Sequence, residues 1–115
     1  MKVLVVGAAG QMGAMTVRDL VDFYDAEIIA GDLNLNNVKK VLKGTKSKKS
    51  TAIQLDASDA QSLKKAAKDV DVVLNCAWYE LNMKIMPAAI AAGAHYTDLG
   101  GLYFETMKQL KLQAA

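Results

Sequence analysis

The fold is decided by the stretch Val3-Leu4-Val5-Val6-Gly7-Ala8-Ala9-Gly10-Gln11-Met12-Gly13. The apolar, β-branched run from Lys2 to Val6 stops at a glycine, which predicts a short strand buried on both faces. From Gln11 to Tyr24 the apolar side chains recur at helical spacing, which predicts a helix. The three glycines therefore lie in the turn that joins a strand to the helix after it.

This G-x-x-G-x-x-G turn has the spacing of a phosphate-binding loop. Gly7 permits a tight turn after the strand, Gly10 leaves room for a diphosphate to approach the backbone, and Gly13 lets the helix pack closely on the sheet. The backbone N–H groups of Gln11 and Met12, in the first helical turn, would then hold the phosphates with the help of the helix dipole. The alternative is a glycine-rich turn that binds no ligand.

Asp32 is the second part of this pattern, because it ends the next predicted strand, Glu27 to Gly31, and lies 19 residues after Gly13. In dinucleotide-binding folds an acidic residue at this distance accepts hydrogen bonds from the adenosine ribose. A carboxylate there would repel a 2′-phosphate, so we expect NAD rather than NADP. Some of the lysines that follow could reach such a phosphate, although a solvated helix face and loop fits them better; these are lysines 39, 40, 43, 46, 48 and 49.

The rest of the chain alternates between strand and helix patterns. Further strands are expected at Thr51–Leu55, Val70–Cys76 and His95–Leu99, and further helices at Leu35–Leu42 (ending near Gly44), after a Ser58/Gln61 capping box, at Leu81–Ala92 and at Phe104–Leu112. The segment Thr45–Ser50 reads as a loop, and Pro87 either kinks its helix or begins a new one. The alternation predicts an α/β fold: a doubly wound parallel sheet of the Rossmann type in three layers, with strand order 3-2-1-4-5.

Ligands of doubly wound folds bind at the carboxyl edge of the sheet, where several further residues are expected. Asp56 follows the third strand and could contact an adenine or cap the helix after it. Asn75, Cys76 and Ala77 end the fourth strand, and Ala77 would let a cofactor lie close to the backbone. The lone Cys76 fits a small core residue better than a reactive thiol, and His95 fits a structural role better than acid–base chemistry. Trp78 and Tyr79 could flank a nicotinamide or cover a face that another domain would bury.

Length and composition narrow the function classes. The 115 residues suit one domain, and the formal charge of +2 with no polybasic arm argues against nucleic acid. No apolar run reaches the roughly 20 residues that span a bilayer, and one cysteine cannot form an internal disulfide, so we expect no membrane partner and a cytoplasmic setting. One cysteine and one histidine cannot build a typical zinc site. A homodimer is compatible with this sequence.

Two stretches resemble the N-terminal cofactor domain of the saccharopine dehydrogenase family. The glycine turn Val3–Gly13 is shared with many Rossmann families, including dihydrodipicolinate reductase and extended short-chain reductases. More specific are the strand Asp71-Val72-Val73-Leu74-Asn75-Cys76-Ala77 and the segment Met86-Pro87-Ala88-Ala89-Ile90-Ala91-Ala92-Gly93-Ala94-His95-Tyr96-Thr97-Asp98-Leu99-Gly100. Leu55-Asp56-Ala57 matches as well.

The resemblance implies an NAD(P)-dependent oxidoreductase that transfers hydride at a C–N bond of an amino acid or polyamine. Saccharopine, carboxynorspermidine, homospermidine and lysine 6-dehydrogenases are the relatives it suggests. By position, the cofactor would be lined by Gly7, Gly10, Gln11, Met12, Gly13, Asp32, Asp56, Asn75, Cys76 and Ala77. The substrate-binding and catalytic part of such enzymes lies mostly beyond this stretch, so we expect residues 1–115 to be a fragment that is inactive alone, and we assign no catalytic residue. The rival hypotheses are a non-enzymatic NAD(H)-sensing domain and an atypical short-chain reductase, although no Tyr-x-x-x-Lys occurs.

Overall fold

Strands and helices alternate along the chain, as the sequence predicts. The computed structural model describes residues 1–46 and 49–113. Within them the elements are β1 (Lys2–Val6), α1 (Gln11–Phe23), β2 (Glu27–Asp32), α2 (Leu35–Lys43), β3 (Ser50–Gln54), α3 (Ala60–Ala66), β4 (Val72–Asn75), a 3₁₀ turn η1 (Tyr79–Leu81), α4 (Asn82–Ala91), β5 (His95–Asp98) and α5 (Tyr103–Leu112).

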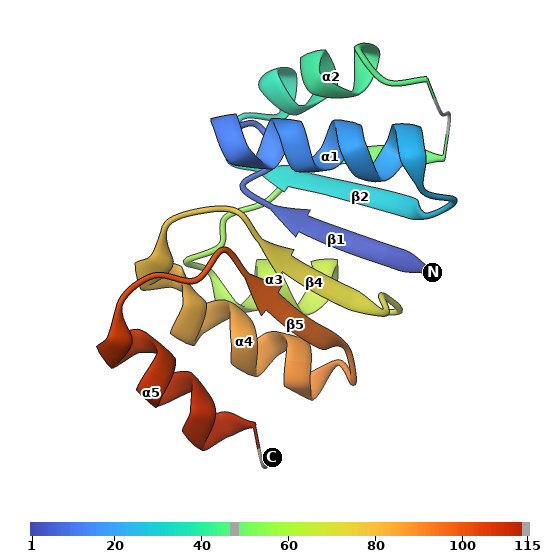
Figure 1. Ribbon diagram of the computed structural model, residues 1–115. Helices are drawn as coiled ribbons and strands as arrows, with labels where there is room; N and C mark the ends of the chain where they lie inside the picture. Colours follow the sequence, from blue (N-terminus) through green and yellow to red (C-terminus); the bar gives the residue numbers. More distant parts are fainter. Residues whose placement is uncertain (47–48, 114–115) are drawn as a thin grey trace.

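The five strands form one parallel sheet in the order β3-β2-β1-β4-β5 (Figure 1). The central strand β1 pairs with β2 on one side and with β4 on the other; Val5, for example, lies between Ala30 and Leu74. The chain therefore changes winding direction between β1 and β4. This confirms the predicted Rossmann topology, and the carboxyl ends of β1 and β4 flank the point where such sheets bind ligands.

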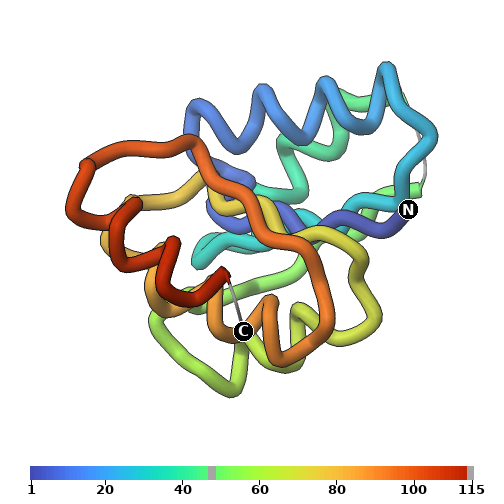
Figure 2. Tube along the Cα trace, turned by 60° about the horizontal axis from the view of Figure 1, so that its bottom comes forward, coloured from blue at the N-terminus to red at the C-terminus, as the bar shows by residue number. Residues whose placement is uncertain are grey.

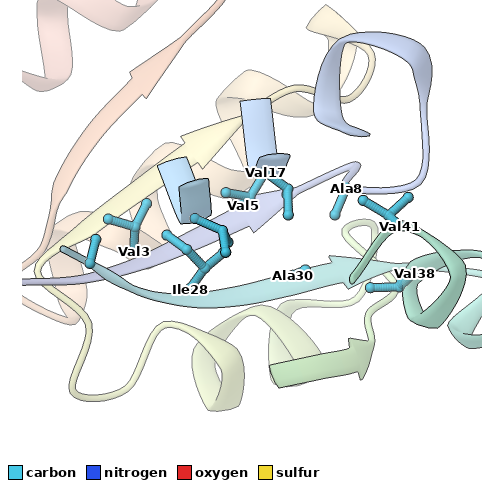
Figure 3. Close-up of a cluster of buried hydrophobic side chains, with 10 residues drawn as sticks. Val3, Val5, Ala8, Val17, Ile28, Ala30, Val38 and Val41 are labelled. Atoms are coloured by element: carbon cyan, nitrogen blue, oxygen red, sulfur yellow. The ribbon is translucent and has the colours of Figure 1, made fainter. Parts of the chain in front are cut away.

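Helices cover both faces of the sheet, which gives the three predicted layers. On one face, valines of α1 and α2 pack on β1 and β2 in a cluster that includes Val5, Val17, Ile28 and Val38 (Figure 3). The opposite faces of the same strands pack against α3 and α4; the residues of this second cluster include Leu4, Val6, Val73, Leu63 and Ile85. Because β1 is buried on both sides, its sequence is apolar at every position after Lys2.

Two details of the helices differ from the predictions. The N-cap of α3 is Asp59, whose carboxylate accepts hydrogen bonds from the amides of Gln61 and Ser62. The predicted Ser58/Gln61 capping box is therefore wrong. A carboxylate one residue nearer to the helix competes successfully with the serine hydroxyl for the same amides. Pro87 lies inside one continuous helix, so α4 does not restart there.

The last helix, α5, has no buried residue. It lies alongside α4 on the outer side of the second layer, as the red and orange helices of Figure 2 show.

The strand β4 is also two residues shorter at its start than predicted, since pairing begins at Val72. In the described ranges, no helix combines the length and the apolar character needed to cross a membrane.

Candidate functional site

The glycine turn is packed so closely that two of its glycines cannot carry a side chain. Gly7 has φ +77°, and a Cβ built on it would lie 2.7 Å from the backbone nitrogen of Ala77. A Cβ on Gly13 would overlap the carbonyl oxygen of Gly7 and lie 2.7 Å from its carbonyl carbon. Gly7 therefore lets the turn touch the end of β4, and Gly13 lets the first turn of α1 touch the turn itself.

Gly10 differs from Gly7 and Gly13, because the surrounding protein leaves room for a side chain at this position. A Cβ on Gly10 would meet only the Gly7 oxygen, at 3.4 Å. Gly10 is the N-cap of α1 and provides no side-chain acceptor for the first helical amides. The amides at the start of a helix have no partner within it and carry the positive end of the dipole. The turn thus presents bare backbone and free N–H groups, which fits an anionic group such as a diphosphate.

Asp32 points at this turn. One carboxylate oxygen, Oδ2, accepts a hydrogen bond of 3.0 Å from the backbone N–H of Ala9. The neighbouring Gly31 carbonyl accepts hydrogen bonds from the amides of Gly7 and Ala8, at 2.9 and 3.0 Å. The tip of β2 is therefore fastened to the glycine turn, and the carboxylate is held beside the place where a bound dinucleotide would cross the sheet edge.

A pocket of about 250 Å³ opens between the strand tips beside Asp32. It is lined by Gly7, Asp32, Asp56 and Ala77 of the predicted set, together with Val6, Leu33, Leu55, Ala57, Ser58 and Leu81. The aliphatic members come from the ends of β1, β2, β3 and η1, so the floor is apolar and the rim carries two carboxylates. That combination suits a flat ring with a polar sugar attached.

Asp56 stabilises the turn before α3. Its Oδ1 accepts hydrogen bonds from both the hydroxyl and the amide of Ser58, at 2.6 and 2.9 Å. The hydrogen bond from the Ser58 hydroxyl, followed by that from its amide, lowers the pKa of the Asp56 carboxyl. Asp56 is not the N-cap of α3, so it fastens the turn while its exposed carboxylate still lines the pocket.

The three residues at the end of β4 have distinct environments. Asn75 is only 1% exposed, and its side chain bonds Asn82 and the amide of Ala77, at 2.6 and 2.9 Å. Cys76 is half-buried against α1, with its sulfur 3.7 Å from the hydroxyl of Thr16. Burial raises the pKa of the Cys76 thiol, which disfavours a thiolate at neutral pH. Ala77 is the residue that touches Gly7.

The remaining candidates are divided between the two edges of the sheet. His95 begins β5 and pairs with Val72 at the amino edge, far from the glycine turn. Trp78 and Tyr79 follow β4 at the carboxyl edge, and their rings lie 5.1 Å apart between centroids. Trp78 is 63% exposed, so it offers a free aromatic face next to the end of β4.

The lysines lie mostly away from Asp32. The helix α2 begins just after Asp32 and runs back along the sheet, so Lys43 at its end is about 12 Å further on at 1.5 Å per residue. The amide of Lys46 bonds Asp22 in the last turn of α1, and the ammonium group of Lys49 bonds Asp25, just after that helix, at 2.6 Å. Lys48 lies outside the described residues.

Across residues 1–46 and 49–113, no group of three or more His, Cys, Asp or Glu side chains is placed to hold a metal ion. A larger hollow of about 700 Å³ lies between α3 and α4; it is lined by alanines, Pro87, Gln61, Asp69 and four lysines, and it includes no residue of the glycine turn.

Comparison with known proteins agrees with this geometry. The sequence model of the saccharopine dehydrogenase NADP-binding domain matches residues 3–115. The chain belongs to this family. It is therefore an NAD(P)-binding Rossmann domain of the saccharopine dehydrogenase type, as the motifs at Val3–Gly13 and Asp71–Gly100 predict.

Solved structures with 24% sequence identity or less show the same fold. Saccharopine dehydrogenase (L-Glu forming) from Saccharomyces cerevisiae is 24% identical with a TM-score of 0.75, over 93% of this chain and 23% of the yeast chain. A short-chain dehydrogenase/reductase from Veillonella parvula in complex with NADP is 18% identical with a TM-score of 0.71, over 84% of this chain and 46% of the other. This Rossmann domain thus spans about a quarter of the length of the yeast enzyme.

The structure also brings in residues that the sequence did not single out. Leu33 and Leu81 line the pocket, and Asn82 is the buried partner of Asn75. Leu33 could have been found, because it directly follows Asp32 at the strand tip. Asn82 could not, since an asparagine in the first turn of a helix is ordinarily a solvent-facing residue.

Proposed function

We propose that this domain holds NAD for an oxidoreductase that transfers hydride at a C–N bond of an amino acid or polyamine. The observation that carries the proposal is the side-chain-free turn at Gly7–Gly13 with the Asp32 carboxylate fastened beside it. The family adds the reaction type, since its name specifies a saccharopine dehydrogenase.

Each predicted residue has a part in this proposal. The amides of Gln11 and Met12, with the bare backbone of Gly7, Gly10 and Gly13, would hold the diphosphate. Asp32 would accept hydrogen bonds from the adenosine ribose, and Asp56 would lie near the base, within the pocket that both line. Ala77 would let the nicotinamide half pass close to the end of β4. Asn75 and Cys76 would support the end of β4 beneath the cofactor, because their side chains bond other protein groups.

The preference for NAD rests on charge. A 2′-phosphate would lie against the Asp32 carboxylate, and the ammonium group of Lys49 in the following loop bonds Asp25, at the opposite end of α1 from the glycine turn. Repulsion between these two anions disfavours NADP. The family name specifies NADP, so this preference would set the present domain apart from the family's nominal cofactor.

The chemistry itself would come from the cofactor, which accepts or donates hydride at its nicotinamide ring. The residues present here bind and orient it. No group of this domain is assigned to the substrate, so turnover would need a substrate-holding part beyond residues 1–115.

Calorimetric titration with NAD and NADP tests the cofactor assignment. Asp32→Asn should weaken NAD binding by about tenfold or more, because a hydrogen bond to a charged group contributes roughly 1.5–3 kcal/mol, and should leave NADP unchanged or improved. Asp71→Asn is the matched control, since Asp71 also accepts one backbone N–H, that of Lys2, but lies at the amino edge. Equal losses in both variants would contradict the role of Asp32.

Turnover tests the reaction class. We expect residues 1–115 to bind dinucleotide but to reduce no NAD with lysine or saccharopine, since the substrate is not held against the ring. Steady-state NADH formation by this domain alone would show that the reacting groups lie within it and would overturn that part of the proposal.

A further inference from the structure

The helices on the second face of the sheet leave an open hollow between α3 and α4. These two helices pack side by side (Figure 1), and the hollow between them has a volume of about 700 Å³. The residues that line it are all different from those that line the pocket beside Asp32. The proposed cofactor site therefore gives this surface no role.

The floor of the hollow is made of small apolar residues. Pro87, Ala88, Ala91 and Ala92 follow one another along one face of α4 and its C-terminal cap, and Ala60 lies opposite them at the start of α3. Most of them, including Pro87, Ala91 and Ala92, are exposed. Because the distance between packed helices depends on the side chains at the contact, so small a set of side chains lets another helix approach closely.

Four lysines surround this floor. Lys64, Lys65 and Lys68 come from α3 and the turn after it, and Lys84 comes from the first turns of α4; the one carboxylate in the lining is that of Asp69. Within residues 1–46 and 49–113, none of these four lysines forms an ion pair with a carboxylate. Four positive charges against one negative charge is a local excess in a chain whose net charge is only +2. A cleft lined by one sign of charge above an apolar floor attracts groups of the opposite charge.

The shape of the hollow favours a polypeptide over a small anion or a membrane. The amides of Gln61 and Ser62 at the start of α3 are already bonded to Asp59, so a small anion would meet mobile lysine side chains and no fixed donor there. The apolar floor lies between two helices, where the flat surface of a bilayer cannot reach it. From Lys84 to Ala92 the floor is about 12 Å long, or two helical turns, at 1.5 Å per residue. This is the length over which an amphipathic helix places its anchoring side chains in a groove.

We propose that the hollow between α3 and α4 is a docking site for an acidic amphipathic helix of a partner protein. The apolar side chains of that helix would lie on the alanine floor. Its glutamates or aspartates would flank the floor and face Lys64 and Lys68 on one side and Lys84 on the other. Contact with the floor would supply most of the affinity, because exposed ion pairs contribute little. The lysines would select an acidic partner and fix its orientation.

Titration of the ¹⁵N-labelled domain with a synthetic helical peptide tests this proposal. The probe has about 14 residues, enough to span the floor, with leucine at every third or fourth position and glutamate on both flanks. Amide shifts should centre on Ala88 and Ala91, with a Kd on the order of 0.1 mM, and the glycine turn should stay unchanged. A peptide with serine in place of leucine and one with lysine in place of glutamate should not bind.

Several results of this titration would overturn the proposal. One is the absence of shifts with the glutamate peptide, and another is equal binding of the serine peptide, since charge alone would then explain the attraction. A response to phosphatidylserine vesicles or to inorganic diphosphate, but not to the peptide, would also overturn it. Neither outcome depends on NAD, so the proposed function is tested separately.

Variants of the protein locate the binding. Lys64→Gln/Lys68→Gln should weaken binding of the glutamate peptide about fivefold, as expected for the loss of two exposed ion pairs. Lys39→Gln/Lys43→Gln is the matched control, because it removes two exposed charges with the same spacing from α2, and it should change the Kd by less than about twofold. Ala91→Phe puts a ring on the floor at an exposed position and should abolish the shifts without changing the circular dichroism spectrum. Equal losses in the two lysine variants, or normal binding by Ala91→Phe, would contradict the proposal.

Discussion

A methyl group added at Gly13 should damage the fold, whereas the same methyl at Gly10 should damage binding only. The Gly13 Cβ would overlap the Gly7 carbonyl and lie 3.0 Å from the Cα of Ala8, and both obstacles are backbone that cannot rotate away. Overpacking of this kind costs about 1–3 kcal/mol, and rigid neighbours favour the upper end. At Gly10 the one contact is at 3.4 Å. The loss of a favourable N-cap glycine is there offset by the lower entropy of the unfolded chain, so the net change should stay below about 1 kcal/mol.

Urea denaturation followed by far-ultraviolet circular dichroism measures the difference. With a slope of about 1.5 kcal/mol per molar urea, Gly13→Ala should lower the midpoint by about 2 M, and Gly10→Ala by less than about 0.7 M. Gly10→Ala should nevertheless lose most of its affinity for NAD, because its methyl lies where the diphosphate approaches. A Gly13→Ala protein as stable as wild type, or a Gly10→Ala protein that binds NAD normally, would refute the packing argument.

Three further predictions concern other parts of the site. Asn82→Leu leaves the buried amide of Asn75 without its partner, so the free energy of unfolding should fall by about 1–3 kcal/mol in urea titrations; an unchanged value would mean that the pair is dispensable. Because burial raises the pKa of Cys76, iodoacetamide should alkylate the thiol more slowly than free cysteine at pH 8, with the rate still rising above pH 9; rapid labelling at neutral pH would contradict this. The hydrogen bond from the Ser62 hydroxyl is the main cause that lowers the pKa of Asp59. The ionised Asp59 carboxylate therefore stabilises the fold above the ordinary carboxyl pKa, and this stabilisation is lost as the pH falls through the lowered pKa of Asp59. The difference in free energy of unfolding between wild type and Asp59→Asn should shrink below about pH 4. A difference that stays constant across pH would contradict this.

The sequence predicted the fold well because its strongest signals are local. Apolar runs such as Lys2–Val6 and the glycine spacing after them depend on residues that are neighbours in the chain, and the strand order follows from their alternation with helices. The position of Asp32 beside the turn also follows from this topology. Four of the ten residues that line the pocket at the sheet edge belong to the predicted cofactor set: Gly7, Asp32, Asp56 and Ala77.

The errors and omissions arise where distant residues decide the outcome. Ser58 and Asp59 are both good helix caps by type, and only the backbone geometry shows that Asp59 reaches the amides of α3. The buried pairing of Asn75 with Asn82 needs β4 and α4 to be packed together, and the hydrogen bond from the Gln109 side chain to Asp98 needs α5 in place. Neither has a sequence spacing that would distinguish it from ordinary surface asparagine and glutamine.

An NMR titration of the ¹⁵N-labelled domain with NAD tests the binding site most directly. We predict that the backbone amides of Ala9, Gly10, Gln11, Met12 and Gly13 shift most, followed by those around Asp32, while the amide of His95 at the opposite edge stays in place. Amide shifts confined to the hollow between α3 and α4, or no shifts in the glycine turn at saturating NAD, would contradict the account.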